Sequence, residues 1–311
     1  MFTTASYEEH GLISISVIAA RRRVTPATIG IAMMLLATLL FTVMDSIAKN
    51  LTASCPVQQV IWARYFFQFA LMLLLLPRLG IAGLLWTRRP GVHIARGLLL
   101  LISTYCMIAA ISIVPLADAY TITFTAPFLV TILSVPLLKE RVGWRRWTAV
   151  LVGFAGVLIV FRPIAAPVHW AMLLPLITAA CFALYQILTR KVSYDSRETA
   201  FMMLFYLAWV GTAVMSALVP AYWQAVAAAD WAWMIGMGAL GAAGHLILIR
   251  ALAITPASLL SPFIYSQIVW ALGIGYFWFG DVPSSWMLIG CAVIVASGLY
   301  VFYREAVLGK T

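Results

Sequence analysis

The sequence predicts an all-α membrane protein with ten transmembrane helices, arranged as two inverted five-helix repeats. Three observations predict this fold. Almost the whole chain consists of apolar stretches of membrane-spanning length, positive charge alternates between the gaps that separate them, and the chain repeats itself weakly. Of the 311 residues, 64% are hydrophobic and only 10% are charged, whereas about a quarter of a soluble domain is charged.

The apolar stretches define the elements. A helix of about 20 residues crosses a bilayer core of about 30 Å, and backbone polar groups cannot stay unpaired in lipid, so each stretch is expected to be a helix. The predicted spans are residues 28–48, 57–77, 93–114, 118–138, 145–162, 169–189, 199–219, 231–250, 257–279 and 285–303.

The gaps between the spans set the orientation. Counted from the N-terminus, one side holds 17 Lys and Arg residues, the other holds only Lys49 and Arg162, and Arg64 lies inside the second span. Basic residues are retained on the cytoplasmic side, so we expect a multi-pass protein of the bacterial inner membrane with both termini in the cytoplasm. Because the net charge of +10 sits in these gaps and tails, the bilayer is the expected partner and nucleic acid is not. A homodimer is left open.

A shift of 141 residues aligns the chain with itself without gaps. Each half holds five spans, an odd number, so the second half enters the membrane inverted relative to the first. Inverted repeats are typical of secondary transporters, whose site lies near the midplane between the repeats. The expected organisation is a tail over residues 1–27, repeats over 28–163 and 168–304, and a tail over 305–311. The matched pairs are Phe41 with Phe182, Lys49 with Arg190, Tyr65 with Tyr206, Pro115 with Pro256, Glu140 with Asp281 and Phe161 with Phe302.

The stretch from Ala110 to Arg146 reads AISIVPLADAYTITFTAPFLVTILSVPLLKERVGWRR. Its Pro-Leu-Ala-Asp-Ala start, Thr-Ala-Pro centre and Lys-Glu-Arg end resemble the fourth-span region of the drug/metabolite transporter superfamily, in particular its EamA-type members. The resemblance extends over about residues 28–303. It implies a ten-helix basket in which spans 1, 3, 4, 6, 8 and 9 surround a central cavity and spans 5 and 10 lie outside it. Bacterial exporters of amino acids, aromatic ones especially, are similar to this chain.

Ionisable residues inside a membrane are costly and are therefore functional candidates. Asp45 lies in the first span, Arg64 in the second, and Asp118 opens the fourth, all towards the outer side. Arg64 and Asp118 are expected to act in gating, or to form a structural ion pair whose side chains reach the interface. We expect His245 to be the one histidine within a span. It either relays protons or forms hydrogen bonds in the cavity wall.

Other candidates are polar and aromatic side chains on the spans expected around the cavity. An apolar wall with hydrogen-bonding tips suits a neutral or aromatic amino acid, although each ring could equally serve ordinary helix packing. Pro127 and Pro262 interrupt the fourth and ninth spans, as gating breaks or as static kinks. Glu140 and Asp281 are expected to cap helices or pair with cations. The candidate cavity residues are Asp45, Thr104, Tyr105, Phe124, Phe128, Phe182, Tyr185, Gln186, His245, Tyr265, Gln267 and Trp270.

The chain contains no GxSxG, HExxH or CxxC motif and no nucleotide-binding loop, so we expect neither an enzyme nor a metal site or cofactor. The predicted function is a secondary carrier that exports amino acids or similar small metabolites by alternating access. A larger cargo, such as a nucleoside-like or S-adenosyl compound, is the alternative, and so is a sensor that does not transport. Proton antiport and downhill facilitation both stay open.

Overall fold

The computed structural model describes residues 25–79, 87, 89–111, 122–161, 170–195, 197–279 and 285–303, and these residues form helices and turns without a β-strand. The helices are α1 (Pro26–Leu51), α2 (Val57–Leu79), α3 (Pro90–Ile111), α5 (Ala126–Leu138), α6 (Trp144–Phe161), α7 (Leu173–Val192), α8 (Ala200–Leu218), α9 (Ala228–Ile254), α10 (Ala257–Leu260), α11 (Ser266–Ile274) and α12 (Ser285–Phe302). Short segments of other helical types are η2 (Trp170–Met172), η3 (Val219–Tyr222), η4 (Ser261–Tyr265) and η5 (Gly275–Phe279).

Six helical segments in the described ranges are long and apolar enough to cross a membrane: α1, α3, α7, α8 with η3, α9, and the run from α10 into η5. The remaining predicted spans also coincide with helices. Of these, α2 carries Arg64 and several glutamines, and α5 has only 13 residues. The first part of the fourth predicted span, including Asp118, lies outside the described residues, as do Asp281 and both predicted tails apart from residues 25–27.

Local chemistry fixes where the helices begin. α1 starts at Pro26 because the hydroxyl of Thr25 accepts a hydrogen bond from the backbone N–H of Thr28 (3.2 Å), and proline is well suited to the first helical position. Glu140 caps α10: its carboxylate accepts from the N–H groups of Ala257 (3.0 Å) and Ser258 (3.1 Å). It also lies 3.8 Å from Arg190 on α7. The predicted capping role of Glu140 is therefore confirmed.

The fourth and ninth predicted spans are both interrupted. A turn at Phe124 and Thr125 precedes α5, and Pro127 lies in its first turn. In the ninth span, η4 separates α10 from α11, and Pro262 lies in the first turn of η4. The two interruptions meet where Thr131 and Ser261 share a hydrogen bond of 2.8 Å. Each proline thus occupies a position where its missing N–H costs little, and both broken spans face the same interior region.

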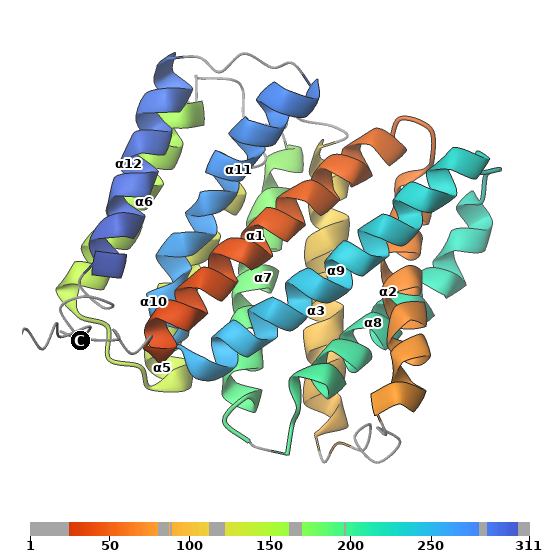
Figure 1. Cartoon of the computed structure of the whole chain (residues 1–311), viewed down its shortest axis with the longest axis horizontal. Helices are drawn as coiled ribbons and strands as arrows, with labels where there is room; N and C mark the ends of the chain where they lie inside the picture. The colour runs from red at the N-terminus through yellow and green to blue at the C-terminus, as the bar shows by residue number, and fades with distance from the viewer. Residues whose placement is uncertain are drawn as a thin grey trace, which may run out of the picture.

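Helix packing follows the internal repeat. α1 packs on α9 as α7 packs on α3, α2 packs on α9 as α8 packs on α3, and α1 packs on α11 as α7 packs on α5. The pairs α2–α8 and α6–α12 map onto themselves when the halves are exchanged. Figure 1 shows α6 and α12 side by side at one edge, while α1 and α9 run together across the front of the other helices. The interface between the two halves therefore runs through the centre of the molecule.

Two glycines allow this close packing. A Cβ on Gly238 of α9 would lie 2.5 Å from Cβ of Phe67 and 2.9 Å from the backbone nitrogen of Gln68, both on α2. A Cβ on Gly97 of α3 would lie 2.7 Å from Cβ of Val210 on α8. The two glycines are 141 residues apart. Equivalent helix crossings in the two halves thus depend on equivalent glycines, which let helix backbones approach closely.

Candidate functional site

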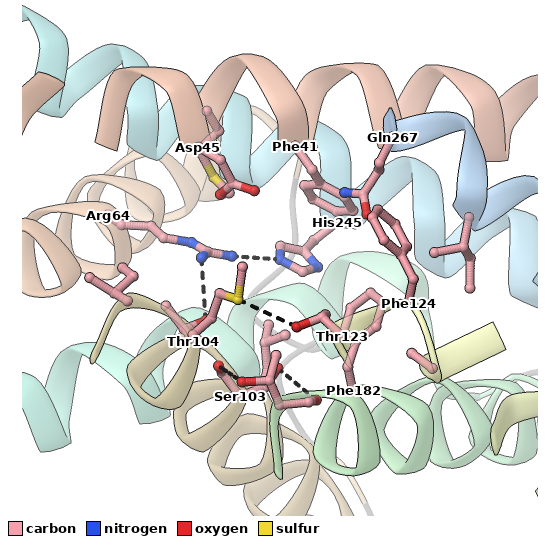
Figure 2. Close-up of a pocket in the computed structure, with 17 residues that line it drawn as sticks. Phe41, Asp45, Arg64, Ser103, Thr104, Thr123, Phe124, Phe182, His245 and Gln267 are labelled. Carbon is pink, nitrogen blue, oxygen red and sulfur yellow. Dashed lines mark hydrogen bonds between the residues drawn. The ribbon is translucent and has the colours of Figure 1, made fainter. Parts of the chain in front are cut away.

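A central pocket of about 120 Å³ lies between the two halves (Figure 2). In the described part of the chain its wall comes from α1, α2, α3, α5 and the turn before it, α7, α9, η4 and α11, and not from α6 or α12. This arrangement agrees with the basket implied by the family resemblance, with α2 as an additional contributor. The side chains that line it include Phe41, Asp45, Arg64, Ser103, Thr104, Thr123, Phe124, Phe182, His245 and Gln267.

The pocket is lined by one carboxylate and one guanidinium. Asp45 of α1 and Arg64 of α2 both line it, and Figure 2 shows them at the same end. Among the described residues, no ion pair within 4.0 Å joins the two side chains. Two unlike charges that face one cavity without pairing directly are each open to a group of opposite charge.

Arg64 is held by one residue from each half. Its Nη1 donates to Thr104 Oγ1 (3.3 Å) and its Nη2 donates to His245 Nε2 (3.1 Å). Thr104 and His245 are 141 residues apart and occupy equivalent positions in the two repeats. The Nε of Arg64 is buried and has no hydrogen-bond partner among the described residues. The guanidinium is therefore oriented from both sides while its Nε–H stays unused.

The contacts of His245 determine its tautomer. A guanidinium can only donate, so Nε2 of His245 must accept, and a neutral imidazole must then carry its proton on Nδ1. That nitrogen lies 3.3 Å from the hydroxyl of Tyr185, and the ring packs against Phe41 at 4.6 Å. In this conformation His245 is a neutral group that positions Arg64.

Aromatic rings and one amide form the rest of the wall. Phe41, Phe124 and Phe182 line the pocket, and Gln267 adds an amide near Phe41 and Phe124 (Figure 2). Phe182 is backed by Tyr185, whose ring stacks on it at 6.1 Å. The pocket thus combines a charged end with a ring-lined body.

The predicted cavity residues separate into three groups. Asp45, Thr104, Phe124, Phe182, His245 and Gln267 line the pocket, and so does the predicted gating residue Arg64. Tyr185 lies directly behind His245, and Gln186 is buried nearby on α7 without lining the pocket.

Four predicted cavity residues lie elsewhere. Tyr105 is 37% exposed, Phe128 packs edge-on against Trp147 of α6, and the hydroxyl of Tyr265 donates to the carbonyl of Val150 on α6 (3.4 Å). Trp270 lines a second, largely apolar pocket of about 460 Å³ between α1, α11 and α12, as Pro262 does. Neighbouring residues on a helix face different directions, so a cluster in sequence does not share one wall.

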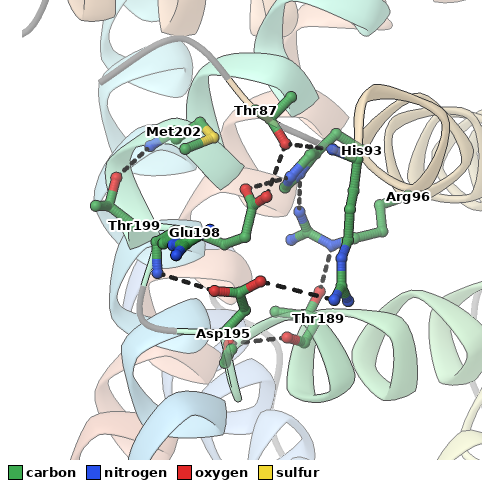
Figure 3. A network of polar contacts seen from close by, with 11 residues as sticks. Thr87, His93, Arg96, Thr189, Asp195, Glu198, Thr199 and Met202 are labelled. Atoms are coloured by element: carbon green, nitrogen blue, oxygen red, sulfur yellow. Dashed lines mark hydrogen bonds and ion pairs between the residues drawn. The ribbon is translucent and has the colours of Figure 1, made fainter. Parts of the chain in front are cut away.

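Sequence reasoning missed a buried polar cluster at the start of α3. His93 is completely buried, so His245 is not the single histidine within the helices. Arg96, counted with the basic residues of a cytoplasmic gap, is also fully buried. Arg96 and His93 contact each other, and His93 also contacts Glu198 (Figure 3). The spacing of His93 and Arg96, which puts them on one helix face, is a signal that could have revealed the contact between these two residues.

No group of three or more His, Cys, Asp or Glu side chains able to hold a metal occurs in the described ranges. The polar groups of the central pocket are instead a guanidinium, an imidazole, hydroxyls, an amide and one carboxylate. The chemistry of such a set suits an organic molecule that offers charges and hydrogen bonds.

Comparison with known proteins identifies the family of this chain. Residues 28–162 and 169–303 each match the EamA-like transporter family. The S-adenosylmethionine uptake transporter of Rickettsia bellii is 32% identical over 281 residues, which cover 89% of this chain and 94% of that protein. The riboflavin transporter of Vibrio cholerae is 31% identical over 281 residues, covering 89% and 93%.

A protein of known crystal structure, 19% identical, superimposes with a TM-score of 0.73 over 91% of this chain and 99% of its own, which shows a shared fold. The family match covers both halves of the chain and nearly all of the described helices. The chain belongs to the EamA-like transporter family and is a multi-pass membrane transporter.

Proposed function

We propose that this protein is a secondary carrier of the bacterial inner membrane that moves a metabolite with a zwitterionic amino-acid head and an aromatic ring, of the S-adenosylmethionine type, by alternating access. One observation carries the proposal. Asp45 and Arg64 present opposite charges to the same ring-lined pocket without forming an ion pair.

The chemistry of such a cargo matches the pocket group by group. Arg64 would bind the carboxylate of an amino-acid head, since guanidinium and carboxylate form short, strong hydrogen bonds. Asp45 would bind the ammonium or sulfonium charge. Phe41 and Phe124 would contact a flat ring, as aromatic side chains do through stacked or edge-on arrangements.

The similar proteins favour the larger cargo over a simple amino acid. The relatives described above are named as transporters of S-adenosylmethionine and of riboflavin, and neither is an amino-acid exporter. An aromatic amino acid, the first prediction from the sequence, has the same charged head but a smaller ring system. The two cargo classes therefore differ in how much of the ring-lined body they would fill.

The size of the pocket supports a carrier that changes shape. At about 120 Å³ the pocket is smaller than the roughly 300–1,000 Å³ of typical ligand sites, so an S-adenosyl compound fits only after the walls separate. Interrupted helices beside the pocket, at Pro127 and Pro262, are the places where transporter helices bend.

The same proposal includes the membrane arrangement. Ten spans in two inverted repeats, with boundaries at residues 28–163 and 168–304 and both termini cytoplasmic, account for the paired helix contacts and for the charge distribution. Inverted repeats with a site between them are the usual basis of alternating access.

Counterflow in proteoliposomes tests the cargo. Liposomes loaded with unlabelled S-adenosylmethionine should take up labelled S-adenosylmethionine, and those loaded with phenylalanine should exchange labelled phenylalanine poorly. Preference for phenylalanine would instead indicate that the cargo is an aromatic amino acid. Absence of counterflow with S-adenosylmethionine, amino acids and nucleosides alike would reject the proposed carrier function for these cargo classes.

A further inference from the structure

A second group of buried ionisable side chains lies outside the pocket, where α3, α7 and α8 meet (Figure 3). His93 and Arg96 come from α3, Thr189 comes from α7, Glu198 precedes α8 and Thr87 precedes α3. His93, Arg96 and Thr189 are each 0% exposed and Glu198 is 6% exposed. Burial of a histidine, an arginine and a glutamate together is costly unless their hydrogen bonds compensate.

The hydrogen bonds of this cluster define its protonation. Glu198 accepts from Thr87 Oγ1 (2.8 Å) and from His93 Nε2 (2.9 Å). Arg96 donates through Nη1 to His93 Nδ1 (3.3 Å) and through Nε to Thr189 Oγ1 (2.9 Å). Because arginine can only donate, Nδ1 of His93 is unprotonated and its proton is on Nε2. The cluster is thus a neutral imidazole between a buried cation and a buried anion.

An added proton would disturb this balance. A proton taken from water by the Glu198 carboxylate would remove the negative charge that compensates Arg96. A proton on His93 Nδ1 would replace the hydrogen bond from Arg96 with repulsion between two cations. Either event leaves a buried positive charge without compensation, which favours a conformation in which the cluster opens. Proton binding here is therefore tied to conformation.

Buried contacts connect the cluster to the pocket. The guanidinium carbon of Arg96 lies 5.3 Å from the ring centre of Tyr185. The Tyr185 hydroxyl contacts His245 Nδ1 (3.3 Å), and His245 Nε2 contacts Arg64 (3.1 Å) in the pocket. Arginine keeps its protons, so this chain of contacts transmits position and charge rather than protons.

Described residues around the cluster include both buried rings and a partly exposed ion pair. Tyr206 of α8 stacks on His93 at 5.2 Å, and Tyr185 lies beyond Arg96. At the rim, Arg89 and Asp195 form an ion pair of 3.6 Å with side chains 51% and 32% exposed. The backbone N–H of Glu198 donates a hydrogen bond to the backbone carbonyl of Asp195 (3.0 Å). Glu198 therefore lies next to the solvated edge.

We propose that the His93–Glu198 pair is a proton-binding site through which this carrier couples proton movement to cargo movement. The proton enters from water at the rim, resides on Glu198 or His93, and returns to water in the alternate conformation. Arg96, Tyr185 and His245 are positioning residues that convey the state of the pair to Arg64. The inference rests on the proposed carrier function.

Transport measurements test the coupling. Proteoliposomes containing the wild type, Glu198→Gln, His93→Gln or the rim control Asp195→Asn are assayed with S-adenosylmethionine, with a pH-sensitive dye trapped inside. Glu198→Gln and His93→Gln should keep counterflow but lose about tenfold or more of the accumulation driven by a pH gradient, which corresponds to a typical coupling free energy. Asp195→Asn should behave as the wild type. Unchanged gradient-driven accumulation in both variants, or wild-type cargo flux without proton movement, would overturn the proposal.

A second measurement needs no cargo and also covers variants that fail to transport. In ¹⁵N-histidine-labelled carrier in detergent, the ring signals of His93 and His245 are followed from about pH 5 to 8, the range in which histidine usually titrates. Proton uptake at the pair should shift the His245 signals with the same midpoint, and Glu198→Gln should move both midpoints together. If His245 does not respond when His93 titrates, the link is refuted. Absent counterflow with an intact linked titration would reject the proposed cargo alone.

Discussion

At the residue scale, an arginine and a carboxylate occur together near a histidine at two points in the interior of the transporter. Asp45 and Arg64 face the pocket, while Arg96 and Glu198 flank His93 nearby. Each arginine donates to an imidazole, so each histidine is held neutral, with its proton on the nitrogen that faces away from the arginine. His245 and His93 are thereby opposite tautomers: Nδ1–H in the first and Nε2–H in the second.

The charge of Asp45 can be tested directly. Asp45→Asn removes the partner for the cationic end of the cargo while keeping side-chain size. Hydrogen bonds to charged groups contribute about 1.5–3 kcal/mol, so apparent affinity in counterflow should fall by about tenfold or more. Asp230→Asn is the matched control, because Asp230 accepts from Ser54 (3.0 Å) outside the pocket. Equal losses in both variants would contradict a role for Asp45 in binding.

His245 is predicted to position Arg64 rather than to carry a proton. His245→Gln keeps a hydrogen-bond acceptor for Arg64 but changes its placement, so apparent affinity should fall by a similar factor at every pH. The measurement is counterflow across a pH series. Unchanged affinity at every pH would contradict a role for His245 in positioning Arg64.

At the element scale, close helix crossings and broken helices shape the pocket. The crossing of α2 and α9 depends on Gly238, and this crossing brings Arg64 and His245 within hydrogen-bond distance. The breaks before α5 and at η4 place Phe124 and Ile264 on the pocket wall. A sequence pattern locates such prolines and glycines, but the partner that each one meets depends on the packing of distant helices.

Gly238→Ala should destabilise the carrier. Its Cβ would overlap α2, and overpacking typically costs about 1–3 kcal/mol, so the midpoint of thermal unfolding in detergent should fall. Gly236→Ala on the same helix is the control: a Cβ there meets nothing within 4 Å, and alanine favours a helix over glycine by about 1 kcal/mol. A stable Gly238→Ala together with an unstable Gly236→Ala would contradict this account of the crossing.

At the scale of the whole molecule, the exchange of the two halves preserves the main helix pairings. Thr104 and His245, equivalent in the repeat, hold the same guanidinium of Arg64 from opposite halves. The pocket is thus symmetric in its framework and asymmetric in its charges. This combination suits a carrier in which the halves move against each other around a cargo with two unlike ends.

The orientation in the membrane has its own test. With 17 basic residues on one side and two on the other, both termini should be cytoplasmic. Alkaline phosphatase is active only after export, so a fusion after Thr311 should show low activity in an inner-membrane host, and a fusion in the gap after residue 48 should show high activity. High activity after Thr311 would invert the proposed topology.

The sequence by itself determined the helical fold, the approximate positions of the described helices and the family. These follow from apolar runs of bilayer length and from motifs in one stretch of chain, both of which are local properties. It also located Asp45, Arg64 and His245, because an ionisable residue is conspicuous in an apolar run.

Only the tertiary structure decided which of the candidates meet. Tyr105 and Tyr265 face away from the pocket although their neighbours Thr104 and Ile264 line it, since one residue along a helix turns the side chain by about 100°. The His93–Glu198 contact joins residues 105 positions apart. It depends on how α3, α7 and α8 pack, so no local pattern in the sequence could specify it.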